Sequence, residues 1–173
     1  MIESILAYST VKYEPQKAEH VDLNVIIRNV LDDLELVISE KEAEVRVQPL
    51  PKIEGSSVLL HQLFYNLVNN ALKFSRGGVK PVVTITSNFL QNAMVEIKLA
   101  DNGIGFSQEA ADKIFQSFVR LHPKDKYEGT GLGLALCKRI VERHGGTIQA
   151  VGQPGNGATF SLRFPQKQQE GTI

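Results

Sequence analysis

The chain has 173 residues, 42% of them apolar and 22% charged, so it can bury one sizeable hydrophobic core and is short for two; we expect one globular domain. Lysine plus arginine equal aspartate plus glutamate at 19 each, which leaves no net basic field to hold nucleic acid or an anionic membrane surface. The single cysteine, Cys137, excludes an intramolecular disulfide framework, and with no signal-peptide pattern and no apolar run near the roughly 20 residues of a membrane span we expect a reducing, cytoplasmic setting.

The N-terminal part of the chain has helical spacing but no residues that indicate chemistry. Met1–Val11 carries apolar residues at helical spacing, and Pro15 breaks the pattern after about two turns. This segment is expected to be the end of a longer helix. Asp22 is a plausible N-cap for an amphipathic helix that runs to about Lys41.

A short strand is expected over residues 44–48, and the helix that follows it, Ser57 to about Ser75, is the most informative helix of the chain. Asn66, Asn70 and Lys73 lie together, off its apolar stripe, at i, i+4 and i+7. This spacing would present oxygen ligands to Mg²⁺ and a cation to a triphosphate. From this helix alone, the favoured alternative is that all three are ordinary exposed polar residues.

An acidic residue follows the hairpin expected from residues 82–86 and 94–99. Asp101 stands where the second strand ends, and Gly103 and Gly105 follow it. A carboxylate can accept a hydrogen bond from an exocyclic amine, and glycines let a flat ligand approach the backbone, a combination that suits adenine. A polar turn after a strand explains this short motif equally well when it is taken alone.

Residues 108–118 resume a short helical pattern that places Ile114, Phe115 and Phe118 at core spacing. The favoured interpretation of both aromatic residues is that they anchor the core. Residues 120–128 are polar, contain a proline and show no periodicity, which predicts a mobile loop.

The glycine-rich stretch 129–134 ends that loop and opens a third helix, which runs to about His144. The free N–H groups and positive dipole end of such a helix start form an anion site, so phosphates are the natural ligand. A Rossmann motif requires different glycine spacing directly after a strand and is rejected. Cys137, in this helix, is expected to be a buried structural thiol.

The chain closes with a hairpin expected from residues 147–151 and 159–164, and the tail from Gln166, polar except for Ile173, is expected to be disordered.

Taken together, these segments resemble the catalytic ATP-binding domain of sensor histidine kinases, within the superfamily that includes gyrase, Hsp90 and MutL. The resemblance covers roughly residues 22–165, and its motifs occur in the order of the family. They are the N box at 66–74 (NLVNNALKF), the G1 box at 101–105 (DNGIG), the F box at 114–118 (IFQSF), the G2 box at 129–134 (GTGLGL) and the closing pattern at 155–160 (GNGATF).

The resemblance implies a role for individual residues. Asp101 would bind the adenine amine of ATP, Asn70 would coordinate Mg²⁺, and Asn66, Lys73 and Arg120 would face the phosphates as catalytic residues. Thr159 would lie beneath the adenine. The other implied nucleotide-binding residues are Gly103, Ile104, Gly105, Phe115, Phe118, Gly129, Thr130, Gly131, Leu132, Gly133 and Leu134.

The fold that the resemblance implies is a two-layer α/β sandwich, a mixed sheet covered on one face by three helices, with ATP between the helices and a lid over about residues 119–129. The three helical and five strand patterns fit such a domain independently. Residues 1–15 would be a remnant of a dimerisation-domain helix and linker, 16–165 the catalytic and ATP-binding domain, and 166–173 a disordered tail.

One family feature is absent from the sequence. None of the four histidines has the neighbours of the family's phosphoacceptor motif, a histidine followed by an acidic residue and then Leu-Arg-x-Pro. The implied partners are therefore the histidine-bearing dimerisation domain of the same kinase and, indirectly, a response regulator. The isolated chain is expected to be inactive without that domain.

Three functions stay open: a histidine kinase module, an ATP-hydrolysing relative or anti-sigma-like serine kinase, and a nucleotide-binding scaffold. The hydrolytic relatives carry a glutamate one turn before the Mg²⁺ asparagine, and Asn66 occupies that position here. An amide cannot act as a general base, so hydrolysis is disfavoured.

Overall fold

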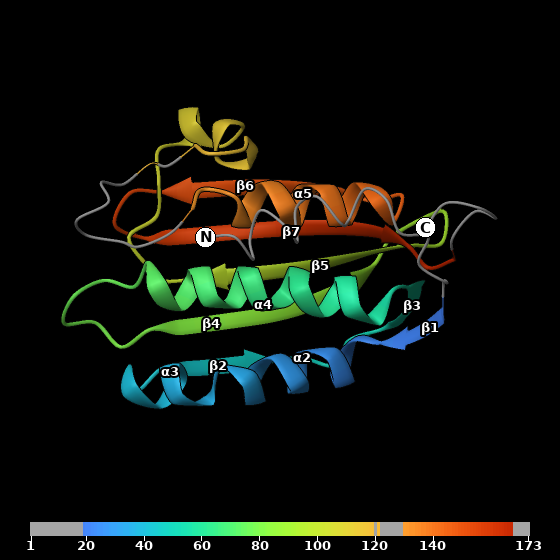
Figure 1. The fold of residues 1–173 in the computed structure, drawn as a ribbon, viewed down its shortest axis with the longest axis horizontal. Helices are drawn as coiled ribbons and strands as arrows, with labels where there is room; N and C mark the ends of the chain where they lie inside the picture. Colours follow the sequence, from blue (N-terminus) through green and yellow to red (C-terminus); the bar gives the residue numbers. More distant parts are fainter. Residues whose placement is uncertain (1–18, 120, 122–129, 168–173) are drawn as a thin grey trace.

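The computed structural model describes residues 19–119, 121 and 130–167, so the expected helix end at 1–15 lies outside the described residues, as does most of the expected lid. A five-stranded mixed sheet forms one layer, in the order β2-β4-β5-β7-β6 (Figure 1). Its strands are β2 (Glu44–Val47), β4 (Val82–Phe89), β5 (Met94–Asp101), β6 (Thr147–Gln153) and β7 (Gly157–Pro165). β2 and β4 are parallel, and the other neighbours are antiparallel.

Helices form the second layer, which confirms the predicted sandwich. α2 (Leu23–Asp33), α4 (Ser57–Lys73) and α5 (Gly133–Arg143) lie on the same face of the sheet (Figure 1). The Asp22 side chain caps α2 by accepting from the Asn24 N–H at 2.9 Å, and the Ser56 hydroxyl caps α4 by accepting from the Leu59 N–H at 3.4 Å. The predicted apolar stripe of α4 is buried, at Leu60, Leu63, Phe64, Leu67, Val68, Ala71 and Leu72, and Leu59 is buried as well.

Strand alternation separates the two faces of the sheet. The residues that face the helices are apolar and buried, among them Ile85, Leu99 and Phe160. The opposite face is polar; there Glu96 accepts from the Nε of Arg163 at 3.0 Å, and its other oxygen lies 3.2 Å from the Nζ of Lys98. One face of the sheet therefore builds the core, and the other meets solvent.

Two features of the N-terminal half differ from the sequence prediction. The helix expected over 22–41 is divided at Leu34, whose backbone (φ −101°, ψ 8°) is not helical, into α2 and α3 (Glu35–Glu40). A second, two-stranded sheet joins β1 (Glu19–Asp22) to β3 (Lys52–Gly55). Strands of four residues carry too little pattern to be predicted.

The C-terminal tail is also ordered further than expected. The Gln166 N–H donates to the Ala93 carbonyl at 2.8 Å, and the Gln166 carbonyl accepts from the Glu54 N–H at 3.0 Å. Gln166 thus links the small sheet to the residue that precedes the start of β5. The rest of the expected tail, from residue 168, lies outside the described residues.

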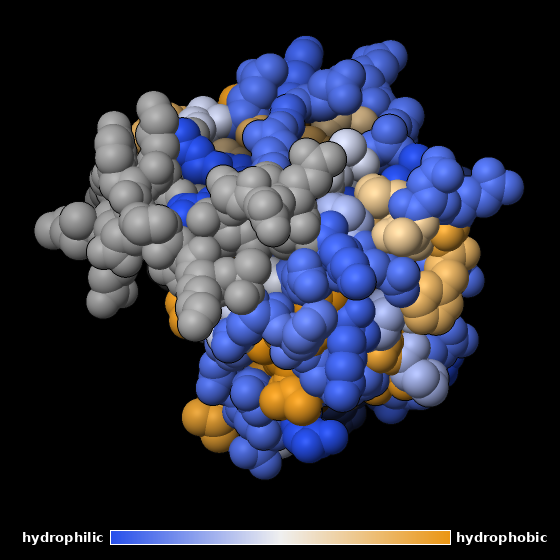
Figure 2. Space-filling model, turned by 90° about the vertical axis from the view of Figure 1, so that its right-hand side faces the viewer, coloured by the Kyte–Doolittle hydropathy of each residue, from blue (hydrophilic) through white to orange (hydrophobic). Residues whose placement is uncertain are grey.

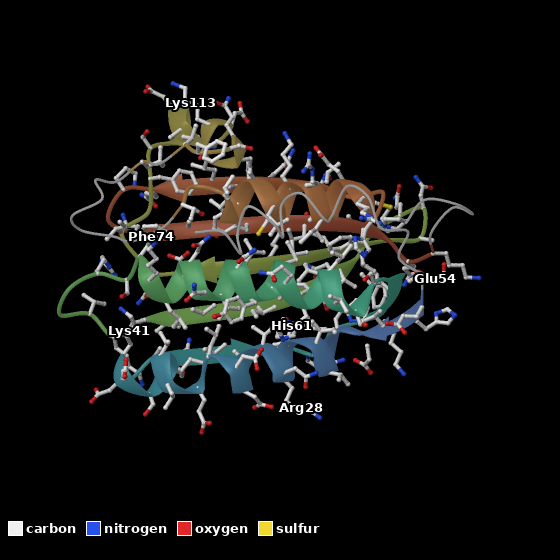
Figure 3. The ribbon with its side chains drawn as sticks, viewed as in Figure 1. Arg28, Lys41, Glu54, His61, Phe74 and Lys113 are labelled. Carbon is white, nitrogen blue, oxygen red and sulfur yellow. The ribbon has the colours of Figure 1, made fainter. Side chains whose placement is uncertain are left out.

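The end of the molecule that carries β1 and β3 is mostly hydrophilic, with its apolar side chains in small separate groups (Figure 2). Across the helix layer, His61 of α4 lies between α4 and α2, and its Nε2 is 3.1 Å from an Asp33 carboxylate oxygen (Figure 3). Within the described residues, no helix is both long and apolar enough to cross a membrane.

His144 joins the end of α5 to the start of α4. Its Nδ1 lies 2.7 Å from the Ile140 carbonyl and its Nε2 3.1 Å from the Ser56 nitrogen, so Nδ1 carries the proton and Nε2 accepts from the Ser56 N–H. Burial lowers the pKa of His144, and Arg143 lowers it further, against the hydrogen bond to Ile140 that raises it. The buried imidazole is held neutral.

This arrangement predicts that acid destabilises the domain through His144. Because the folded-state pKa is below the ordinary 6.5, the stabilisation is complete above about pH 6.5 and is lost as the pH falls towards the folded-state pKa. For a single group the loss cannot exceed about 1.4 kcal/mol per pH unit. Urea unfolding at about pH 7.5, 6.5 and 5.5 should show a free energy of unfolding that falls with pH in the parent and falls less in His144→Gln.

Arg28→Gln, at an exposed position of α2 whose side chain does not titrate in this pH range, provides the control and should keep the slope of the parent. An unchanged slope in His144→Gln would show that His144 does not govern the acid response.

Candidate functional site

The predicted site residues gather at one end of the sandwich. β5 ends there at Asp101, α4 ends at Lys73, α5 begins at Gly133, and β6 turns into β7 (Figure 1). α4 and α5 pack against each other in the helix layer. Segments far apart in sequence therefore meet where the helix layer and the sheet end together.

Asp101 is held by the backbone of two neighbouring segments. Its Oδ1 accepts from the Gly103 N–H at 2.8 Å and from the Ala158 N–H at 3.3 Å. Register places its side chain on the helix-facing side, with Leu99. Burial raises the pKa of Asp101, and the two N–H donors lower it by less. The structure records no partner for Oδ2 among the described residues, so one carboxylate oxygen is left to accept a hydrogen bond.

Three glycines allow backbones to approach more closely than a side chain permits. A Cβ on Gly103 would lie 2.5 Å from the Phe74 carbonyl oxygen, at the end of α4. A Cβ on Gly105 would collide with the Gln153 carbonyl oxygen, and one on Gly157 with the Asp101 carbonyl oxygen. Gly105 and Gly157 also have positive φ, 62° and 88°. The loop after Asp101 is therefore interlocked with α4 and with the β6–β7 turn.

The polar residues of α4 lie on its half-buried side. Asn70 and Lys73 are half-buried, and the Nζ of Lys73 lies 4.7 Å from the centroid of the Phe74 ring, whose place at the end of α4 is labelled in Figure 3. No hydrogen bond of the Asn70 side chain is recorded within the part of the chain that the structure describes. Asn70 thus keeps an amide oxygen available as a ligand.

Asn66 faces α5. Its Oδ1 accepts from Gln62 Nε2 at 3.3 Å, while its Nδ2 is buried without a hydrogen-bond partner of ordinary geometry among the described residues. The amide lies beside the thiol of Cys137, whose pKa burial raises to about 12 and the amide lowers in part. The Asn66 amide and the Cys137 thiol thus lie in contact between α4 and α5, and Nδ2 has no oxygen acceptor among the described residues.

Cys137 is buried, as predicted, and its thiol lies 3.8 Å from the Leu63 carbonyl of α4.

The glycine-rich segment opens α5 as predicted. Gly131 has a φ of 73° and lies against Phe118 and Val119, where a Cβ would come within 3.0 Å of Phe118 Cα. Leu132, at the N-cap, makes no side-chain cap hydrogen bond, and a Cβ on Gly133 would meet no atom within 4 Å. The N-cap side chain therefore satisfies none of the first N–H groups of α5, which suits them to an anionic ligand.

The other members of this segment are placed as follows. Thr130 Oγ1 accepts from the Leu132 N–H at 3.4 Å, and Leu134 is half-buried. Gly129 and Arg120 lie outside the described residues.

The expected helix at 108–118 is replaced by two short 3₁₀ helices, η1 (Gln108–Ala110) and η2 (Lys113–Phe115). Phe115 packs edge-on against Phe160, with the ring centroids 6.4 Å apart. The prediction that Phe118 anchors the core is wrong: 69% of its surface is exposed and its φ is 66°. Core spacing of i+3 and i+4 requires an α-helix, and η2 ends before Phe118.

The expectation for Thr159 also needs correction. Thr159 pairs with Ala100 and Val151, whereas its neighbours Ala158 and Phe160 are buried towards the helices. Alternation therefore directs Thr159 to the face of the sheet away from Asp101. Ala158, which donates its N–H to Asp101, occupies the place that Thr159 was expected to fill. The sequence already indicated this, because strand alternation places Ala158 and Phe160 on one face and Thr159 on the other.

Sequence reasoning missed residues that support the site by long-range contacts. Asn102 accepts at its Oδ1 from the Val82 N–H at 2.9 Å and donates from Nδ2 to the Lys80 carbonyl at 3.0 Å. Gln108 accepts from the Gly152 N–H at 3.2 Å and donates to the Ala150 carbonyl at 3.4 Å, so its amide pairs with the edge of β6. No sequence pattern marks these pairings.

The fold and these contacts define a class: an α/β sandwich domain that gathers, at one end of a mixed sheet, a half-buried carboxylate, two helical amides and a glycine-rich helix start that its N-cap residue does not cap with a side chain. The chain belongs to the family described as histidine kinase-, DNA gyrase B- and HSP90-like ATPases, whose model matches residues 55–168.

Individual relatives agree with this membership. The chain is 36% identical over 165 residues to the phytochrome-like protein Cph1 of Synechocystis sp., an alignment that covers 95% of this chain and 22% of that protein. Its fold is similar to that of full-length ShkA in complex with AMPPNP (TM-score 0.81, 26% identity, 99% of this chain and 36% of that one). It is also similar to the mycobacterial sensor histidine kinase MprB (TM-score 0.73, 28% identity, 88% and 100%). The chain thus spans about a fifth of the length of Cph1.

The interlocked glycines predict a graded series of alanine variants. Gly77→Ala, with no atom within 4 Å and an ordinary φ, should change the free energy of unfolding by less than about 0.5 kcal/mol. Gly155→Ala, with a φ of 77° but open space, should cost about 1 to 2 kcal/mol. Gly157→Ala combines positive φ with the collision against Asp101 and should cost about 3 kcal/mol or more.

Urea unfolding of the three variants measures this order. Equal stability of Gly155→Ala and Gly157→Ala would mean that the close approach to Asp101 is not a constraint.

Proposed function

We propose that this chain is the catalytic domain of a sensor histidine kinase, which binds Mg-ATP and transfers its γ-phosphoryl group to a histidine on a dimerisation domain. The observation that carries the proposal is Asp101, a half-buried carboxylate whose Oδ1 is fixed by two backbone N–H groups while Oδ2 has no recorded partner among the described residues. Family membership and the AMPPNP complex of ShkA support a nucleotide as the ligand.

Asp101 would select adenine. Its Oδ2 would accept a hydrogen bond from the exocyclic amine of adenine. Guanine has a carbonyl oxygen at the same position, and two hydrogen-bond acceptors would then face each other without a proton between them. The interlocked glycines Gly103, Gly105 and Gly157 support this role, because they keep side chains away from the backbone around the carboxylate.

The phosphates would lie between α4 and α5. The N–H groups at Gly131 and Gly133 would donate to phosphate oxygens, the amide of Asn66 would face the phosphates, and Lys73 would supply positive charge. Arg120 and Gly129, outside the described residues, remain predicted contributors. Mg²⁺, when bound, neutralises charge on the phosphates, and the amide oxygen of Asn70 would hold it.

Transfer to histidine is favoured over hydrolysis by the residue at position 66. Hydrolysis needs a group that activates water, and an amide has no basic electron pair for this task. Phosphoryl transfer needs mainly positioning and charge stabilisation around an in-line acceptor. A dimerisation domain of the same kinase would provide the acceptor histidine, and a response regulator would then receive the phosphoryl group in the cytoplasm.

The proposal predicts that the chain transfers phosphate only when a separate histidine-bearing segment is supplied. With labelled ATP and Mg²⁺, the isolated chain should neither label itself nor release phosphate at an appreciable rate. Addition of a separate dimerisation segment carrying the native histidine should give an acid-labile label on that segment. Asn70→Ala should abolish it, and Arg28→Ala, on the exposed side of α2, should not.

Two results would contradict the proposal in different ways. Rapid phosphate release by the isolated chain, lost in Asn70→Ala, would assign it to the hydrolytic relatives. Bound ATP without any label on the supplied segment would leave a nucleotide-binding scaffold.

A further inference from the structure

Arg76 joins three segments that surround the candidate site. Its Nε donates to the Asn102 carbonyl at 2.8 Å, and its Nη1 donates to the Gly155 carbonyl at 2.8 Å. Arg76 itself lies in the loop between α4 and β4. One guanidinium thus connects the end of α4, the loop that follows Asp101 and the β6–β7 turn.

Each carbonyl that Arg76 holds is next to a residue that sets the position of Asp101. Asn102 directly follows Asp101, and its own side chain is tied to Val82 and Lys80. Gly155 donates its N–H to the Ile104 carbonyl at 2.7 Å, and two residues later Gly157 approaches the Asp101 carbonyl. The β6–β7 turn also leads to Ala158, the second donor to Asp101 Oδ1.

We infer that Arg76 is a positioning residue for base recognition, which keeps the Asp101 carboxylate aligned with the adenine amine without touching the nucleotide. This inference rests on the proposed function. The physical reason is geometric: the planar guanidinium offers several N–H groups in a fixed fork, so it spans two carbonyls in one orientation, and hydrogen bonds from a charged donor are the stronger kind. A lysine ammonium in the same place keeps the charge but not the fork.

Nucleotide titrations of the folded chain test this inference. Arg76→Met and Arg76→Lys should each weaken ATP binding on the order of tenfold, and AMP binding by the same factor, because the defect lies at the base. The matched control is Arg28→Met, which removes an exposed arginine on α2, away from the site in Figure 3, and should bind both nucleotides as the parent does. Urea unfolding establishes that each variant is folded under the assay conditions.

A double-mutant cycle separates positioning from a general loss of structure. In the Asp101→Asn background the effect of Arg76→Met should shrink to about twofold or less, since the carboxylate that Arg76 aligns is gone. Full additivity of the two substitutions would overturn the inference. So would parental ATP affinity in Arg76→Lys, which would assign the effect to charge, or a loss confined to ATP, which would assign it to a phosphate contact.

Titration of the parent chain with ATP and GTP distinguishes a failure of this inference from a failure of the proposed function. A parent that binds GTP as well as ATP would refute base recognition by Asp101 itself. A parent that prefers ATP, with Arg76→Met indistinguishable from Arg28→Met, would refute only the role of Arg76.

Discussion

The site depends on one constraint: backbones from three distant segments pass closer together than a Cβ atom allows. Gly103 lies against the Phe74 carbonyl, Gly105 against that of Gln153, and Gly157 against that of Asp101. These approaches bring the end of β5, the end of α4 and the β6–β7 turn into one rigid unit. The carboxylate of Asp101 can then be held by main-chain N–H groups, whose positions do not vary with side-chain rotamers.

The position of Asp101 lowers the stability of the ligand-free fold, and its proposed role in binding adenine explains why a carboxylate stands there. Burial raises its pKa, so the ionised form is disfavoured in the folded state, and the stability present at low pH is lost as the pH rises through the folded-state pKa. At neutral pH the carboxylate therefore destabilises the ligand-free domain. His144 behaves in the opposite sense, because its pKa is lowered and its neutral form supports the fold. The half-buried Asp101 thus belongs to the site, whereas the buried His144 stabilises the fold.

Sequence patterns predicted the parts of the structure that local spacing controls. The apolar stripe of α4 follows from the helical period of 3.6 residues, and the end of β5 at Asp101 follows from the strand period of 2. The start of α5 follows from the run of glycines before it. No glycine or proline marks the helix break at Leu34, so the sequence did not predict it. The burial of Phe118 was predicted wrongly because an α-helical period was applied to a segment that forms a 3₁₀ turn.

The remaining differences arise from long-range contacts. Arg76, Asn102 and Gln108 act through carbonyls and N–H groups of segments remote in sequence, which no local pattern reveals. Thr159 is a different case, since strand alternation from the buried Phe160 was sufficient to place it on the outer face.

The central claim is that a fixed carboxylate at the end of β5 selects adenine, and calorimetric titration of the chain with ATP and with GTP, each with Mg²⁺, tests it most directly. The account predicts that GTP binds at least about tenfold more weakly than ATP, because Asp101 Oδ2 would face a carbonyl oxygen in place of an amine. Equal affinities for the two nucleotides would contradict it.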